Sequence, residues 1–555
     1  MKRIFALFIA LAVAGAVMAA ECVIVPRPVS YEAQKGKCVL LSLETAVYVA
    51  DKSLVRPATM FCSYVEAEKG LRLSVIEGAT PAKSESAIVL SVDKSLAEEE
   101  YQLDVTKKGV IIKGGSEKAV FYGLQSLRQV VFHAKAKDAK ADLPFHAKTK
   151  GTKVELPCMK VEDKPHFGYR GNMLDVCRHI FTVEQVKEYI DILAMHKINR
   201  FHWHLTEDQG WRIEIKKYPN LIKVGSQRKE TIVGRYNKKE TPKYDGKPYG
   251  GYFTQDEVRD IVRYAAERYI EVIPEIDMPG HMVAALASYP ELGCTKGPYE
   301  VRTRWGISED VLCAGRESTF EFVEGVLAEI LELFPSKYIH VGGDECPKLR
   351  WKECPDCQKR IKEEGLKDEF ELQSYFIHRV EKFLAKNGRH LIGWDEILEG
   401  GISKTATIMA WRGAKRGIAA AKLGNQVVMT PTHYCYLDYA QTSNRKANKE
   451  PISGGGNGKR PLTMRKAYSF DPYDQLNEQE QKCIIGVQGN MWTEYVATYD
   501  HLQRMILPRM AAIAEVGWSY GNKDYDDFTR RMFLLRKLYD KCGYKYAPYF
   551  FEYIE

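Results

Sequence analysis

Residues 337–345 read Lys-Tyr-Ile-His-Val-Gly-Gly-Asp-Glu. The apolar residues up to Val341 are of the kind that fills a buried parallel strand. The two glycines that follow let the backbone turn, or approach a ligand closely, where that strand ends. Asp344 and Glu345 come next, in the loop. Gly-Gly-Asp-Glu alone is typical of a solvated acidic turn, but adjacent carboxylates at a strand end also suit acid/base chemistry when their pKa values differ.

Seven further strands are predicted around this one. Short apolar or alternating runs predict them at residues 169–176, 200–205, 269–276, 390–394, 405–411, 426–430 and 483–488. Helix starts are predicted at three capping boxes, Thr182 with Gln185, Thr254 with Glu257 and Ser318 with Glu321. Two more helices are predicted, one from Glu369 to a C′ glycine at Gly388 and one over 500–514.

Eight strands with mostly helical connections indicate an α/β fold of the (β/α)8, or TIM barrel, type. A doubly wound open sheet is the alternative, but no Gly-x-Gly-x-x-Gly follows a strand. The glycine-rich run 453–460 lacks the Ser or Thr and the leading strand of a phosphate loop. A small α+β domain of short strands and one helix, without chemistry of its own, is expected before the barrel.

The 555 residues suit two or three domains. We predict a signal peptide over 1–20, the α+β domain over 21–162, the barrel over 163–520, and a C-terminal segment over 521–555 that packs on the barrel. The signal peptide rests on Lys2, Arg3 and the apolar run up to Val17. The mature chain is therefore expected in the periplasm, at the cell surface or secreted, without a transmembrane segment. The signal favours a bacterial origin.

The composition narrows the choice of partners. The 81 basic and 73 acidic side chains give a net charge of +8 without a basic block, which argues against a nucleic-acid partner. The oligomeric state and a lipid on Cys22 remain open questions.

Cysteines leave several alternatives open. Export permits disulfides, and the odd count of 13 leaves at least one thiol unpaired. Cys294 and Cys313 bracket one loop region and are candidates for a disulfide. Cys354-Pro-Asp-Cys357, with Cys346 nearby, is a candidate metal clip or redox pair, but a lone Cys-x-x-Cys is weak evidence for zinc. We expect no metal and no cofactor.

Polar or aromatic residues stand at the ends of all eight strands, where a TIM barrel carries its active site. They are Asp175, Arg178, His179, His202, His204, Glu207, Asp208, Glu275, Asp277, His281, Asp344, Glu345, Trp394, Asp395, Glu396, Trp411, Tyr436, Asp438, Trp492 and Glu494. Carboxylates that bind hydroxyls, beside Trp faces that contact C–H-rich rings, describe a sugar site. A phosphate ligand would instead predict backbone nests and more basic side chains.

Several of these residues have a structural alternative. His202 and His204 share a strand face and could ligate a metal, but without a clear third ligand a hydrogen-bonded structural role is favoured. Glu275, Asp277 and some others are expected in the barrel interior.

The motifs resemble those of the β-N-acetylhexosaminidases of glycoside hydrolase family 20, in the family's order. They are His340 to Glu345, Asp175 to His179, His202 to Trp211, Pro274 to His281, Gly393 to Glu396 and Tyr436 to Asp438. The resemblance covers about residues 166 to 520, and the N-terminal unit resembles the small domain that precedes the family's barrel.

The resemblance implies a retaining, substrate-assisted mechanism, in which the 2-acetamido carbonyl of the substrate attacks the anomeric carbon. Glu345 would be the general acid and Asp344 would orient the acetamido group, with Asp208 and His281 as a relay that supports the acid. Glu207, where many members have Asp, is expected beside the relay. The remaining matches are substrate-binding residues, namely Arg178, Trp394, Trp411, Tyr436, Asp438, Trp492 and Glu494.

Three functions are therefore weighed. The first is exo-hydrolysis of terminal β-linked GlcNAc or GalNAc from glycans. The second is release of a disaccharide such as lacto-N-biose, which needs a pocket open beyond one ring. The third is a catalytically inactive glycan-binding protein, against which the intact Asp344, Glu345 and Tyr436 argue. Linkage preference and the natural glycan are not specified by these motifs.

Overall fold

The structure is a computed structural model that describes residues 21–34, 39–78, 81, 86–137, 153–236, 239–443 and 460–552. The predicted signal peptide and most of the glycine-rich run at 453–460 lie outside these ranges. The chain divides into two compact units. One comprises Met1–Val23 and Pro28–Asp163, and the other Ile24–Arg27 and Lys164–Glu555. Among the described residues, no helix combines the length and apolar character needed to cross a membrane.

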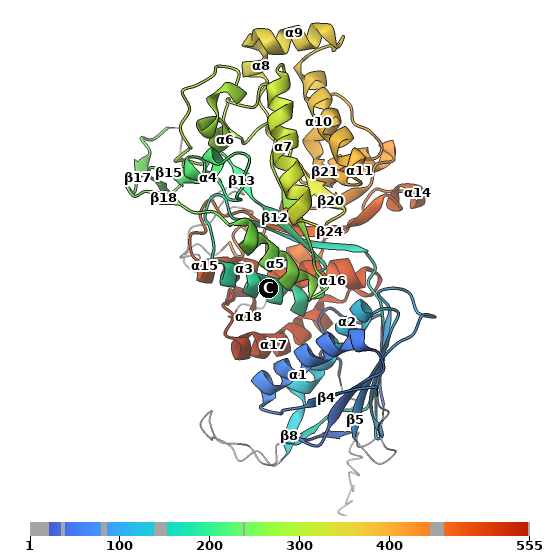
Figure 1. The fold of residues 1–555 in the computed structure, drawn as a ribbon. Coiled ribbons are helices and arrows are strands. Elements are labelled where there is room, and N and C mark those ends of the chain that lie inside the picture. The colour runs from blue at the N-terminus through green and yellow to red at the C-terminus, as the bar shows by residue number, and fades with distance from the viewer. Residues whose placement is uncertain are drawn as a thin grey trace, which may run out of the picture. The chain divides into compact units, whose positions relative to one another are not determined.

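The first unit is built on a seven-stranded mixed sheet. Its strand order is β1 (Ser30–Ala33), β10 (Met159–Asp163), β6 (Tyr101–Thr106), β7 (Gly109–Gly114), β5 (Ala87–Val92), β3 (Ala46–Val49) and β4 (Ser74–Glu77). Helices α1 (Val55–Lys69) and α2 (Glu117–His133) pack together against the sheet (Figure 1). Ser116 caps α2 by accepting from the Ala119 N–H.

The second unit confirms the predicted TIM barrel. Its eight strands pair in parallel in chain order, and the last closes on the first. They are β11 (Tyr169–Asp175), β12 (Arg200–His204), β19 (Glu271–Glu275), β20 (Tyr338–His340), β21 (His390–Trp394), β22 (Thr407–Ala410), β23 (Val427–Met429) and β24 (Ile484–Met491).

Helices lie around the barrel (Figure 1). They are α3 (Val183–Met195), α5 (Gln255–Ala266), α7 (Glu317–Leu333), α10 (Glu369–Lys386), α11 (Ala414–Leu423), α15 (Tyr499–Ile506) and α16 (Arg509–Ser519). The capping boxes at Thr182 and Thr254 are confirmed, as is the left-handed glycine after α10, Gly388. The β21–β22 connection carries only a short 3-10 turn over Asp395–Leu398.

Two helix predictions are wrong in detail. Ser318 does not cap α7, because the helix begins at Glu317 and Arg316, two residues before Ser318, is in the cap position. The Arg316 side chain is held there by hydrogen bonds to loop carbonyls, and its Nη1 donates to the Glu291 carbonyl oxygen at 2.6 Å. The helix predicted over 500–514 is two helices, α15 and α16, because Pro508 has no N–H to donate and disfavours helical backbone in the residue before it.

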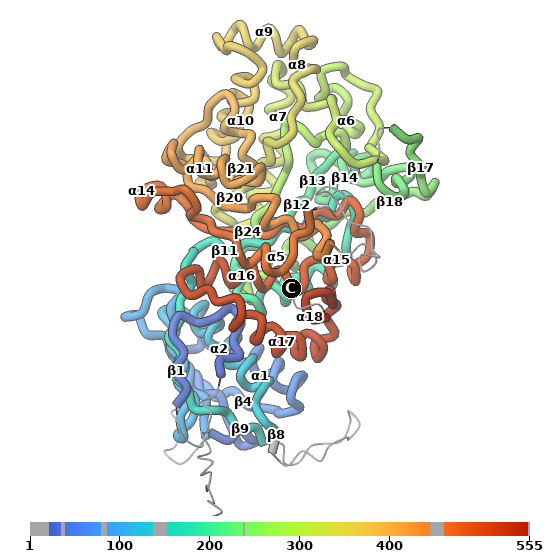
Figure 2. Tube along the Cα trace, turned by 180° about the vertical axis from the view of Figure 1, so that it is seen from behind, coloured from blue at the N-terminus to red at the C-terminus, as the bar shows by residue number. Residues whose placement is uncertain are grey.

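The C-terminal residues form α17 (Tyr525–Cys542) and α18 (Tyr549–Glu552), which lie beside α16 and α15 in both views (Figures 1 and 2). Arg531 of α17 pairs with Glu515 of α16 at 2.6 Å, and both side chains are fully buried. Removal of one partner from a buried ion pair is strongly destabilising, so this pair stabilises the packing of the C-terminal segment on α16.

Candidate active site

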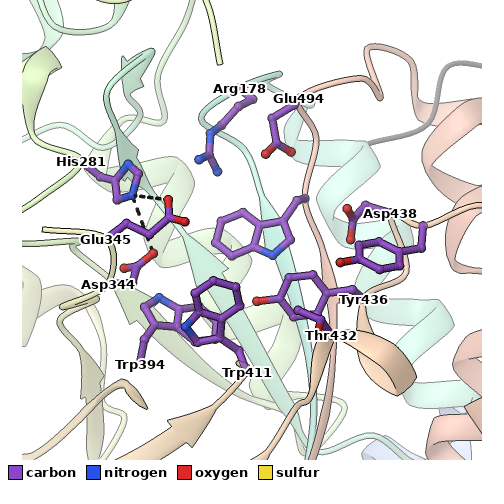
Figure 3. A pocket seen from close by; sticks show the side chains of 12 residues that line it. Arg178, His281, Asp344, Glu345, Trp394, Trp411, Thr432, Tyr436, Asp438 and Glu494 are labelled. Carbon is purple, nitrogen blue, oxygen red and sulfur yellow. Dashed lines mark ion pairs between the residues drawn. The ribbon is translucent and has the colours of Figure 1, made fainter. Parts of the chain in front are cut away.

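The carboxyl ends of the barrel strands surround a cavity of about 270 Å³ (Figure 3). Its lining comprises Arg178, His281, Asp344, Glu345, Trp394, Trp411, Thr432, Tyr436, Asp438, Tyr439, Trp492 and Glu494. Every residue that the resemblance assigns to catalysis or substrate binding lines the cavity except Asp208, which lies behind His281. The loops from different strands thus bring together residues that are far apart in the sequence.

The turn after β20 delivers Asp344 and Glu345 to the cavity. Gly342 and Gly343 have φ values of +67° and +94°, a left-handed backbone that suits glycine. A Cβ on Gly342 would lie only 1.7 Å from Oδ1 of the buried Asp277. Glu345 itself has φ +44°, so the surrounding structure holds it in an unfavourable backbone conformation.

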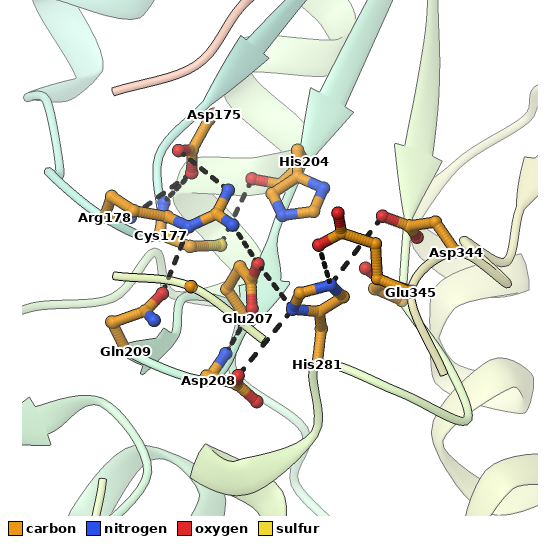
Figure 4. Close-up of polar contacts among 12 residues, drawn as sticks. Asp175, Cys177, Arg178, His204, Glu207, Asp208, Gln209, His281, Asp344 and Glu345 are labelled. Carbon is orange, nitrogen blue, oxygen red and sulfur yellow. Dashed lines mark hydrogen bonds and ion pairs between the residues drawn. The ribbon is translucent and has the colours of Figure 1, made fainter. Parts of the chain in front are cut away.

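His281 links the two carboxylates to a second acidic pair (Figure 4). Its Nε2 lies 3.4 Å from Oε2 of Glu345 and 3.8 Å from Oδ2 of Asp344. Its Nδ1 lies 3.0 Å from Glu207 Oε1 and 3.7 Å from Asp208 Oδ2. Although burial lowers it, the charges of Glu207 and Asp208 raise the pKa of His281 well above its ordinary value. The ring is therefore a cation that faces the carboxylates in the cavity.

The sequence prediction that Glu207 lies beside the Asp208–His281 relay is wrong. Its carboxylate is nearer to His281 than that of Asp208 is, and it also pairs with Arg178. Asp208 is held back because Arg302 Nη1 donates to its Oδ2 at 2.9 Å and the Val283 N–H donates to its Oδ1 at 3.1 Å. Glu207 is thus a part of the relay.

The two carboxyl groups of the pair have pKa values shifted in opposite directions in the free site. Burial raises the pKa of Asp344 to about 7, and the neighbouring Glu345 adds to this rise. Glu345 is less buried. Although its partial burial raises the pKa, the hydrogen bond and charge of His281 lower it below the ordinary value. The two environments differ as acid/base work requires, but the direction is opposite to the one expected for a reacting complex with a protonated Glu345.

Arg178 and Glu494 form another wall of the cavity (Figure 3). The Arg178 guanidinium pairs with Asp175 at 3.3 Å and donates to Gln209 at 3.1 Å. It also lies 5.0 Å from the ring centre of Trp492. Burial raises the pKa of Glu494, which Arg178 partly offsets. Within the described chain, buried Oε2 of Glu494 and Oδ1 of Asp344 have no hydrogen-bond partner, so both are available to donors on a ligand.

Aromatic rings complete the cavity. Trp411 and Tyr436 stack with centres 6.1 Å apart, and Trp492 lies 5.9 Å from Trp394 and 6.4 Å from Tyr436. The Trp411 indole N–H donates to Glu396 at 2.9 Å, which fixes the plane of its ring. These flat, rigid faces suit the C–H-rich surface of a sugar.

A buried hydrogen-bonded cluster lies beneath the rings. Glu275 accepts from the Trp394 indole N–H at 2.8 Å. Three histidines also contact it, His202 at 2.9 Å, His204 at 2.6 Å and His340 at 3.1 Å. Burial raises the pKa of Glu275, but the three histidines bring it well below its ordinary value. His202 and His204 thus contact a buried carboxylate as predicted, and Glu275 and His340 are the neighbouring ligand-type groups that the sequence did not reveal.

Thr432 and Tyr439 line the cavity but were not predicted. Both come from the segment after β23 that also carries Tyr436 and Asp438, with Thr432 as the first residue of the short helix α12 (Thr432–Cys435), so their nearness in sequence was the available signal. Hydroxyl residues in a loop have no periodicity by which to single them out.

The sequence was compared with protein families and with known proteins. Residues 167–520 match the model of "Glycosyl hydrolase family 20, catalytic domain", and residues 21–164 match "Glycosyl hydrolase family 20, domain 2". A β-hexosaminidase of Porphyromonas gingivalis is 45% identical over 88% of this chain, which covers 60% of that protein's length. A β-hexosaminidase of Akkermansia muciniphila is 35% identical over 79% of this chain and 83% of its own length.

A solved structure shows the same fold. The exo-β-N-acetylglucosaminidase of Vibrio harveyi in complex with N-acetylglucosamine aligns with a TM-score of 0.81 and 30% identity, over 95% of this chain and 78% of that one. With family models that together match most of its length, the chain belongs to glycosyl hydrolase family 20.

Proposed function

We propose that the protein is an exo-acting β-N-acetylhexosaminidase, which removes terminal β-linked GlcNAc or GalNAc from the non-reducing ends of glycans. The observation that carries this proposal is the placement of Asp344 and Glu345 on one side of the aromatic cavity and Tyr436 on the other (Figure 3). A ring bound between them presents its acetamido group and its glycosidic oxygen to the three groups that the reaction needs.

The size of the cavity favours a single sugar ring. Its volume of about 270 Å³ is slightly below the roughly 300–1,000 Å³ that is usual for ligand sites. Arg178, Glu494 and Asp438 offer charged partners for ring hydroxyls, and Trp492 offers a floor for the ring. Release of a disaccharide requires a second ring within the cavity and is the weaker alternative.

The mechanism follows from these positions. The acetamido oxygen, held by the Tyr436 hydroxyl, attacks the anomeric carbon, while Glu345 protonates the leaving oxygen. Asp344 accepts from the acetamido N–H and stabilises the positive charge that develops on the oxazoline ring. Glu345 then takes a proton from water, which opens the oxazoline and gives a product of retained configuration.

Substrate binding must first reverse the proton's place in the pair. A bound acetamido N–H donates to Asp344 and favours its ionised form. The bound ring also displaces water from Glu345, and the new charge on Asp344 lies beside it, so both effects raise the pKa of Glu345. The proton thus moves from Asp344 to Glu345 when the substrate binds.

Paired aryl substrates test the proposal. The protein should hydrolyse an aryl β-N-acetylglucosaminide rapidly and the matched β-glucoside very slowly, because the glucoside lacks the internal nucleophile. Equal cleavage of both would refute the substrate-assisted mechanism. Cleavage of an aryl lacto-N-bioside alone would support disaccharide release. Full kcat/KM of a Glu345→Gln variant on a substrate with a poor leaving group would exclude Glu345 as the acid.

We also propose that the mature protein is exported, on the composition of residues 1–20. N-terminal sequencing of the protein from its host should begin at Ala20 or Glu21. A chain that begins at Met1 would contradict export through this signal.

A further inference from the structure

Four cysteines that are distant in the sequence meet at one point in the barrel unit. Cys294 follows the 3-10 turn η2 (Pro290–Leu292), and Cys313 follows Leu312, which bridges to Gly293. Cys354 caps α9 (Pro355–Glu363), and Cys357 lies in that helix's first turn. All four sulfur atoms lie within 4.8 Å of one another.

The spacing of the sulfurs does not fit disulfides. Cys313 Sγ lies 3.6 Å from Cys357 Sγ and 3.7 Å from Cys354 Sγ, and Cys294 Sγ lies 3.9 Å from Cys357 Sγ. A disulfide needs about 2.05 Å, and all four residues are free thiols. A tetrahedron of sulfurs about 2.3 Å from a central Zn²⁺ has edges of about 3.8 Å. The observed separations are close to that edge.

We propose that Cys294, Cys313, Cys354 and Cys357 together bind one Zn²⁺ ion in a structural site. Four thiolate ligands leave no position for water or substrate, so the ion would act on the fold and not on the reaction. Three of the four side chains are almost completely buried, as a closed structural site requires.

The surroundings bring the two ligand loops together. A Cβ on Gly315 would lie 2.2 Å from the backbone of Asp356, so glycine permits the loops to touch. The positive N-terminal end of α9 lies at Cys354 and Cys357.

Arg316 joins both ligand loops and supplies positive charge. Its guanidinium donates to the carbonyl oxygens of Gly293 at 3.0 Å and Cys294 at 3.3 Å, and to the Asp356 carboxylate at 2.6 Å. Four thiolates around a divalent cation bear a net negative charge, which this guanidinium offsets. Hydrogen-bonded outer partners of this kind are typical of metal sites.

The site would fasten the loops that carry the catalytic groups. The Leu312 N–H, next to Cys313, donates to the Pro279 carbonyl at 3.0 Å, two residues before His281. The Trp351 indole N–H donates to the Leu312 carbonyl at 2.9 Å. The chain runs from Glu345 past Trp351 directly to Cys354. A zinc ion would therefore tie the segment after Glu345 to the segment after His281.

Metal analysis of the full-length protein, purified without added metal or reductant, tests the site. We expect about one zinc per chain, and loss of that zinc in the double variant Cys354→Ser/Cys357→Ser. The matched control is Cys483→Ser/Cys542→Ser, which removes two partly exposed cysteines outside the cluster and should keep the zinc. Zinc retained by both variants would overturn the proposal.

Two further measurements use the unaltered protein, so misfolding of a variant cannot affect their outcome. Protein loaded with Co²⁺ should show the sulfur-to-cobalt charge-transfer band and the intense visible bands of a tetrahedral thiolate site. Alkylation in denaturant with a chelator should modify all four cysteines. Peptide mapping that finds them in disulfides, or free thiols without metal and without the cobalt bands, would overturn the proposal.

Discussion

Replacement of His281 by glutamine should shift the whole pH profile of kcat/KM to higher pH. His281 is a cation next to both carboxylates of the cavity, so it stabilises their ionised forms. Glutamine keeps a hydrogen-bond donor at that place but removes the charge. Both pKa values of the Asp344–Glu345 pair must then rise, and with them both limbs of the bell-shaped profile, which reports the free enzyme.

The size of the shift follows from the distances. Nε2 of His281 lies 3.4 Å from Glu345 and 3.8 Å from Asp344. Two charges about 4 Å apart interact by roughly 4 kcal/mol at an effective dielectric constant of about 20. That energy corresponds to a ceiling of about three pH units. The Glu345 side chain is 35% exposed, and water screens it, so we expect a shift of about one to two units.

The assay is kcat/KM for an aryl β-N-acetylglucosaminide, measured across the pH range in which each protein stays folded. His390→Gln is the control, because His390 is exposed at the opposite end of its barrel strand from Trp394 and should leave the profile in place. A His281→Gln profile that is lower but has both limbs where they were would refute the electrostatic reasoning. In that case the histidine would only hold Glu345 in position.

A change of pH and two further substitutions have defined outcomes. In the unaltered protein, kcat/KM should fall about tenfold per unit above pH about 7, because the pair loses its only proton as the pH passes the pKa of Asp344; a profile that still rises there would contradict the assignment. Glu345→Gln should reduce kcat/KM by roughly 10²–10⁴ for a poor leaving group and far less for an acidic aryl group, whereas equal losses would argue against proton donation. Gly342→Ala should lower Tm much more than Gly388→Ala, because both have positive φ but only the first puts a Cβ 1.7 Å from Asp277 and the second meets nothing within 4 Å.

The barrel could be predicted because each strand leaves its own local signal. Buried parallel strands are apolar on both faces, and threonine caps at Thr182 and Thr254 mark helix starts through contacts only three residues long. The cap predicted at Ser318 failed because contacts of Arg316 with a distant loop decide where that helix begins. Local patterns do not contain such contacts.

The candidate site also has features that the sequence predicts and features that it does not. Residues at strand ends could be placed together because the barrel topology brings those ends to one face. The role of Glu207 could not be read from its position, since it depends on how two neighbouring carboxylates lie around His281 in the folded chain. The meeting of the four cysteines was equally hidden, because Cys294 and Cys313 belong to a different loop from Cys354 and Cys357.

The opposite pKa shifts of Asp344 and Glu345 in the free protein have one more consequence. At a pH between the lowered pKa of Glu345 and about 7 for Asp344, the pair holds one proton before any substrate binds. In the proposed reaction, substrate binding then requires no proton from the solvent, because the proton passes between two adjacent side chains. The proton for the first bond cleavage is thus present before a glycan binds, and only the hydrolytic half of the proposed cycle takes hydrogen from bulk water.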